Sequence, residues 1–285
     1  MEQTIGALSL GLIAALCWGL HDICVRKVSQ NTPLMASLLA VLIAGSILQG
    51  GIMAATGGFS SVSGRAAGYA ALSGLFFLVA SLGLYGAFQR GPVRLVAPII
   101  ASYPILSVGW AALSGTPISA LEWGAVLVII VGVSIVAALS DDSDTEIPPK
   151  GRTILYALIA AIGFAGTFAI GQVATGMAED MPVILITRVV AIVVLVAIMA
   201  AKSLPFWPGR AAVPVLAMMG ALDGIALICV LSAGGLPDAQ YAAVASSVFG
   251  LLTVVMAWAF LKERMTGPQW VGVGLSFAGI GYLAI

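Results

Sequence analysis

The segment Gly11-Leu-Ile-Ala-Ala-Leu-Cys-Trp18 returns 146 residues later as Ala157-Leu-Ile-Ala-Ala-Ile-Gly-Phe164, and both copies keep Leu-Ile-Ala-Ala. The same shift places Tyr103 over Phe249. Landmarks that repeat in one order at one offset indicate an internal duplication. We therefore interpret the chain as two copies of one structural unit, with the segment around Trp18 and its second copy at matching positions.

The composition indicates an integral membrane protein. Hydrophobic residues make up 61% of the 285 residues and charged residues 8%, whereas soluble domains carry about 25% charged residues. The apolar stretches approach the roughly 20 residues that cross a bilayer as a helix. They are apolar on every face, which favours helices over the alternating strands of a barrel. The first stretch continues into a multi-span pattern, so we expect no cleaved signal peptide.

Charges, prolines and glycine-rich breaks divide the chain into ten predicted spans. They are 6–28, 33–56, 66–88, 93–113, 121–139, 153–174, 182–201, 211–232, 241–261 and 268–285. The polar stretch 140–152 is the predicted linker between five-helix units at 1–139 and 153–285. Because five is odd, the second unit enters the membrane upside down. The predicted fold is an all-α integral membrane protein of ten transmembrane helices in two inverted five-helix repeats.

The positive charges predict the orientation. Ten of the twelve Lys and Arg residues fall in the odd-numbered loops, and the opposite side holds only Arg65. By the positive-inside rule the odd-numbered loops, including the linker, are cytoplasmic. We therefore expect a multi-pass protein of a bacterial inner (cytoplasmic) membrane, with both termini periplasmic.

Three motifs resemble one known family. They are Ala15-Leu-Cys-Trp-Gly19, Ala97-Pro-Ile-Ile-Ala-Ser-Tyr-Pro104, and Leu251 to Arg264 followed by a Trp-x-Gly-x-Gly start to the last span. In series the motifs resemble the drug/metabolite transporter superfamily, in its ten-span form with two EamA domains. The chain departs from the family at Gly250, where proline is usual, and at 115–117, where Glu-Arg is common. The resemblance implies a central cavity, lined mainly by spans one, three, four, six, eight and nine, that moves small metabolites by alternating access.

Arg188 and Asp223 are the charges expected inside the hydrocarbon, where a charge costs at least about 2.5 kcal/mol. Counting 1.5 Å per residue from the span ends puts both at similar depth, so they are expected to pair. One interpretation is an ion pair that locks two helices. The other is a substrate site in which Arg188 binds a carboxylate or phosphate and Asp223 an amine or a proton. The matching positions of the first unit are apolar, which favours the second interpretation.

His21 is the single histidine. It shares a helix face with Ala14, Trp18 and Val25, and an imidazole titrates near neutral pH, as a proton-coupled cycle would need. A packing role near the helix end is the alternative. Asp22 is expected to point elsewhere and to pair with Arg26 one turn on.

Rings and hydroxyls complete the predicted substrate site. An aromatic lining binds aromatic cargo by stacking and cationic cargo by cation–π contact, although rings in membrane helices also serve as packing. Serine and threonine there often bond only their own backbone. The predicted substrate-binding residues are Trp18, His21, Tyr85, Ser102, Tyr103, Phe164, Thr167, Arg188, Asp223, Ser247 and Phe249. The predicted gating residues are Pro98, Pro104 and Gly250, where helices kink.

Other function classes find little support in the sequence. There is no metal-ligand cluster, nucleotide-binding motif or polar catalytic cluster, so we expect no cofactor, no metal and no enzyme. A net charge of zero argues against nucleic acid. We expect a monomer that is surrounded by lipid and transports a small-molecule substrate. Protons are a candidate coupling ion. Export of an amino acid or related amine is favoured. The alternative transport function is uptake of a vitamin, nucleoside or amine, and the alternative oligomeric state is a dimer. The alternative protein class is a lipid-modifying enzyme or a sensor.

Overall fold

The computed structural model is all-helical over the residues that it describes, which are 2–58, 60–113, 118–139, 149–236 and 239–283. The α-helices are α1 (Glu2–Val28), α2 (Leu34–Thr56), α3 (Gly64–Arg90), α4 (Val93–Ala101), α5 (Pro104–Leu113), α6 (Ala120–Ala138), α7 (Lys150–Thr175), α8 (Asp180–Ala201), α9 (Val213–Ser232), α10 (Gln240–Ser246), α11 (Phe249–Phe260) and α12 (Gly267–Leu283). Short 3-10 turns, η1 (Arg210–Ala212) and η2 (Ala233–Gly235), flank α9.

These helices form ten spans, because α4 with α5 and α10 with α11 each make one broken span. Eight segments are long and apolar enough to cross a bilayer by length and composition. The α4–α5 span is interrupted, and α12 is described over 17 residues. The predicted bounds lie within four residues of the observed ones where the chain is described. The linker at 140–148, the Gly-Thr-Pro segment at 115–117 and the last two residues of the predicted tenth span lie outside the described part.

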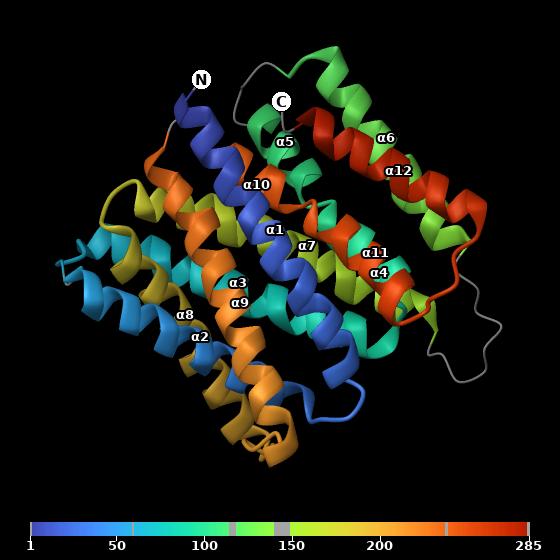
Figure 1. Cartoon of the computed structure of the whole chain (residues 1–285). Helices are drawn as coiled ribbons and strands as arrows, with labels where there is room; N and C mark the ends of the chain where they lie inside the picture. Colours follow the sequence, from blue (N-terminus) through green and yellow to red (C-terminus); the bar gives the residue numbers. More distant parts are fainter. Residues whose placement is uncertain (1, 59, 114–117, 140–148, 237–238, 284–285) are drawn as a thin grey trace.

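The two units interleave rather than lie side by side (Figure 1). Helix α1 packs against α9, α10 and α11 of the second unit, while α3 packs against α7 and α8 and α2 against α9. Helix α6 lies along α12 at one edge. The crossings are close: a Cβ on Gly132 of α6 would clash with the Gly272 carbonyl oxygen of α12. Glycine permits such a close backbone approach in membranes, and here it lies between two helices of the same chain.

The breaks in the two spans occur at matching places in the repeat. Helix α4 ends at Ala101 and α5 begins at Pro104, and 145 residues later α10 ends at Ser246 and α11 begins at Phe249. Pro104 lacks the N–H that would continue the first helix. In the second span the hydroxyls of Ser246 and Ser247 donate to carbonyls three residues back, which competes with the helical ladder. Both spans are therefore interrupted at corresponding positions of the two units.

Candidate functional site

A narrow cavity of about 20 Å³ lies among helices of both units. Every lining residue is at most 7% exposed, so the cavity lies in the interior. Helices α1, α2, α3, α7, α9 and α11 and the α4–α5 junction supply the lining. The lining residues are Trp18, His21, Asp22, Leu38, Val41, Leu42, Ser81, Leu84, Tyr85, Tyr103, Phe164, Phe168, Asp223 and Phe249. Span two lines the cavity in addition to the six spans that were expected.

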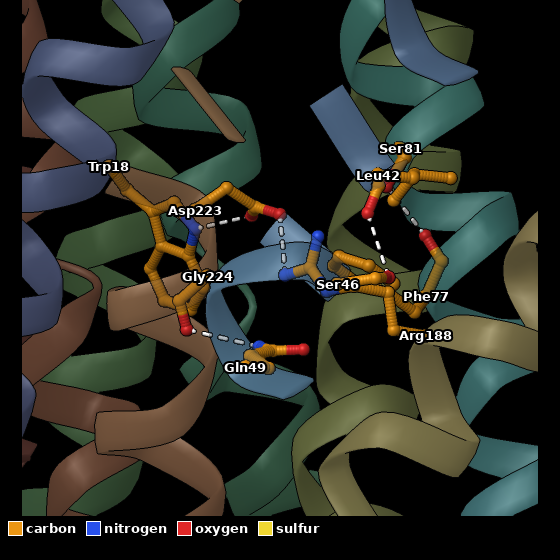
Figure 2. Close-up of polar contacts among 9 residues, drawn as sticks. All are labelled: Trp18, Leu42, Ser46, Gln49, Phe77, Ser81, Arg188, Asp223 and Gly224. Carbon is orange, nitrogen blue, oxygen red and sulfur yellow. Dashed lines mark hydrogen bonds and ion pairs between the residues drawn. The ribbon is translucent and has the colours of Figure 1, made fainter. Parts of the chain in front are cut away.

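A charged network borders one side of the cavity (Figure 2). Trp18 of α1 donates from Nε1 to Oδ1 of Asp223 on α9 at 3.0 Å. The other oxygen, Oδ2, lies 2.9 Å from Nη2 of Arg188 on α8. The predicted pairing of the two buried charges is therefore confirmed. The network joins the first unit to the second, because Trp18 belongs to one and the ion pair to the other.

Arg188 contacts Asp223 from outside the set of residues that line the cavity. Its side chain is fully buried, and Arg188 is not among the described residues that line the cavity. The guanidinium lies over the Phe77 ring, with Cζ 5.4 Å from the centroid. A Cβ on Gly45 would lie 2.5 Å from Arg188 Nη1, so glycine on α2 leaves room for the guanidinium. The prediction that Arg188 binds a substrate carboxylate does not fit this geometry, because its charge faces Asp223 and not the empty space.

A second acidic pair lies on α1. Asp22 is 1% exposed, and its Oδ1 is 2.9 Å from Nδ1 of His21. The expectation that Asp22 points away from the cavity and pairs with Arg26 is wrong. Arg26 instead donates to the Phe88 carbonyl oxygen at 2.6 Å. The reason is helical spacing: Asp22 lies four residues after Trp18, so both occupy one face.

Five rings form an aromatic cluster: Trp18, Tyr103, Phe164, Phe168 and Phe249. Phe168 is at its centre, with centroid distances of 5.4 Å to Trp18 and 5.3 Å to Tyr103. Tyr103 also donates to the Ala243 carbonyl, which fixes its ring at the helix break. The predicted Tyr85 lies apart from the cluster and meets the His21 ring edge-on at 6.1 Å. Rings of this kind offer faces to an aromatic or cationic ligand.

Three predicted hydroxyl ligands do not line the cavity in the described part of the chain. Ser102, Thr167 and Ser247 each donate to a carbonyl of their own helix, at 2.7, 2.8 and 2.6 Å. This is the common backbone bond of hydroxyls in membrane helices.

The predicted gating residues lie at or near the breaks. Pro98 lies inside α4, Pro104 begins α5, and Gly250 is the second residue of α11. A Cβ on Gly250 would lie 2.5 Å from the Ala101 Cβ, so this glycine lets α11 approach α4. Their role in gating stays a prediction.

Asp22, Phe168, the α2 residues, and Ser81 and Leu84 of α3 were missed by the sequence reasoning. The repeat contained a usable signal for the first two, because 22 plus 146 is 168 and both positions line the cavity. Trp18 with Phe164 and Tyr103 with Phe249 obey the same rule. The α2 contribution had no polar or aromatic marker, since Leu38, Val41 and Leu42 resemble any membrane-helix residue.

Comparisons with known proteins agree with this architecture. A family model described as "EamA-like transporter family" matches residues 5–138 and again 151–285. One solved crystal structure is similar to the chain, with a TM-score of 0.72 at 16% sequence identity. The similarity covers 98% of this chain and 97% of the other and concerns the fold alone. No curated protein matches the chain.

Proposed function

Because the chain belongs to the EamA-like transporter family, we propose that it is a secondary carrier that exports a small organic amine by alternating access. Membership in a transporter family, and not an enzyme family, makes it a membrane transporter with a small-molecule substrate. The identity of the cargo and the direction of transport are our proposal. So are the domain boundaries at 139 and 153, the inner-membrane location and the monomeric state.

The chemistry of the cavity supports an amine. Its described lining carries two carboxylates, Asp22 and Asp223, and five clustered rings, while the permanent cation Arg188 stands behind Asp223. A protonated amine gains from a carboxylate and from aromatic faces together. An apolar or aromatic body suits the remaining leucine and valine walls. The observation that carries the proposal is therefore this acidic, ring-lined interior.

A zwitterionic amino acid is the second candidate. His21 lines the cavity and, when protonated, supplies the one cation among the described lining residues. A substrate carboxylate would then face His21 while its amine faces Asp223. An amino acid is therefore expected to bind best at a pH at which the imidazole is charged. A simple amine is not expected to bind best at that pH.

A thermal-shift screen of the purified protein tests the proposal. Phenylethylamine should raise the melting temperature more than phenylalanine, a nucleoside or a vitamin at equal concentration. Phe168→Leu, which keeps most of the volume but loses the ring, should weaken amine binding by about three- to tenfold. Phe260→Leu is the matched control, since Phe260 is 73% exposed on the outside. Equal stabilisation by all four compounds, or an unchanged Phe168→Leu, would contradict the amine site. Lower accumulation of labelled amine in producing cells would support export.

A further inference from the structure

We propose that the His21–Asp22 pair is a proton-binding site of the transport cycle, and that the Arg188–Asp223 pair is not. The inference rests on the proposed carrier function and adds the coupling ion and the residues that hold it. It starts from a difference between the two carboxylates that line the cavity, Asp22 and Asp223, each of which is paired with a basic group. Both carboxylates are buried, but one faces a guanidinium and the other an imidazole.

The two partners differ in what they can do near neutral pH. A guanidinium is always charged, so Arg188 balances Asp223 at every physiological pH. Imidazole is the side chain that changes charge between about pH 5 and 8. The formal charges of Asp22, Asp223, Arg188 and His21 therefore sum to −1 with a neutral imidazole and to zero with a protonated one. The pair on α1 can therefore change the charge of the cavity by one unit near neutral pH.

The geometry leaves His21 Nε2 free to accept a proton. An ionised Asp22 accepts only, so the 2.9 Å contact requires the hydrogen on Nδ1 of His21. Nε2 then carries the free lone pair, and it is buried without a hydrogen-bond partner among the described residues. Asp22 Oδ2 is likewise buried without one. A proton taken up at Nε2 yields an imidazolium still held by Asp22, and no bond of the fold breaks.

The surroundings of the pair contain few other titratable groups. Helix α9 contributes Asp223, with Arg188 of α8 behind it, and α3 contributes Tyr85, whose ring meets His21. On α1 itself Cys17 and Cys24 lie near, and Arg26 is engaged with the Phe88 carbonyl.

The other neighbouring helices add tyrosines, and α7 also carries Lys150 and Arg152 in its first turn. Tyr103 lines the cavity from the α4–α5 junction, and α2 and α11 hold no titratable side chain. Tyr241 of α10 lies toward the other end of α1, because α10 meets α1 at Gly11 through Ala242. Among the described lining residues, the imidazole is the side-chain type whose ordinary titration range includes neutral pH.

The charge of the cavity links the proton to the cargo. A cation restores neutrality when the imidazole is neutral, and a proton on His21 does the same. An amine and a proton thus oppose each other's binding without touching the same atom. Protonation should weaken binding of a cationic ligand by about tenfold or more in this buried site. One consequence is exchange of one amine for one proton.

The single histidine allows a direct test without any cargo. The full chain is labelled with 15N-histidine, purified through a tag that contains no histidine, and reconstituted in lipid nanodiscs. Its one imidazole should take up a proton during a pH titration. Asp22→Asn should weaken that proton binding about tenfold or more, and Asp180→Asn, at the start of α8, is the matched control. An imidazole with one protonation state throughout, or one unaffected by Asp22→Asn, would overturn the proposal.

A second measurement separates this inference from the carrier function. Proteoliposomes with a trapped pH dye receive a gradient of phenyltrimethylammonium, which can neither carry a proton nor cross the bilayer in a neutral form. Wild type should move about one proton per labelled cation, and His21→Gln none. Absence of cation flux with a titrating imidazole would refute the amine carrier and leave the proton site supported. Cation flux with equal proton flux in His21→Gln would refute the proton site.

Discussion

Arg188 and Asp223 show what a buried ion pair does at the scale of single residues. Replacing one partner leaves the other charge unpaired in a low-dielectric interior, which costs about 3–5 kcal/mol, whereas replacing both can be nearly neutral. The pair can therefore lock α8 to α9, orient the carboxylate that lines the cavity, or do both. The two interpretations left open by the sequence differ in what a double substitution does to ligand binding.

Arg188→Met and Asp223→Leu should each lower the free energy of unfolding by about 3–5 kcal/mol, and the double variant should recover most of that loss. Thermal unfolding in detergent measures this, with Phe260→Leu as the reference. If Asp223 contacts the cargo, the stable double variant still fails to bind phenylethylamine. A double variant that binds the amine normally would show that the pair is only a lock.

Part of this residue chemistry was predictable. The depth of Arg188 and Asp223 followed from 1.5 Å per residue, and their pairing is observed. The partner of Asp22 was not predictable, because three basic groups lie within five residues of it and side-chain rotamers decide among them. Whether Arg188 faces the cavity or its wall depends on the packing of α2, about which the sequence of α8 says nothing.

Elements of different repeats are tied together at the ends of the broken helices. Helix α4 begins after Pro92, which offers no capping side chain. Glu263, beyond α11, supplies both oxygens instead, 2.9 Å from the Val93 nitrogen and 3.1 Å from the Arg94 nitrogen. A carboxylate at a helix N-terminus satisfies free N–H groups and the helix dipole together.

Glu263→Gln should lower the melting temperature, because an amide presents one acceptor where the carboxylate presents two. The expected loss is about 1–3 kcal/mol. Glu122→Gln is the matched control: Glu122 caps its own helix α6 through Ser119 and joins no two elements. Equal destabilisation by the two substitutions would contradict a special role for the contact between repeats.

Span boundaries were predictable within a few residues because prolines and charges mark them. The break between α4 and α5 was expected at Pro104. The break between α10 and α11 lies two residues before the predicted weak point Gly250, since serine side chains rather than the glycine end α10. Serines in an apolar run bond either their own backbone or a neighbour, and the sequence does not distinguish the two.

The whole molecule joins two similar units into an asymmetric interior. The ten spans were predictable from composition, and the repeat was predictable from the 146-residue offset. That helices of both units line one cavity was predicted only from the family resemblance. The polar residues that break the symmetry are Arg188, Asp223, His21 and Asp22, whose counterparts at the 146-residue offset include Phe77 and Phe168. A cavity can thus be built from similar helices and still present different chemistry on its two sides.

Orientation is tested on the whole chain. Arg65→Cys and Arg210→Cys place thiols at exposed positions on opposite sides of the membrane. A maleimide that cannot cross membranes should label Arg65→Cys in spheroplasts and label Arg210→Cys only after the membrane is opened. The reverse pattern would place the termini in the cytoplasm.

The contact between Gly45 and Arg188 also constrains how this interior can have arisen by mutation. A side chain at position 45 would occupy the space of the guanidinium, 2.5 Å from Nη1. The same Cβ would lie 2.8 Å from the Gly220 carbonyl oxygen, so the close approach of α2 and α9 also requires glycine at 45. A substitution at 45 therefore has to displace the Gly220 backbone as well as the guanidinium, so the buried charge on α8 depends on a helix that carries no charge itself.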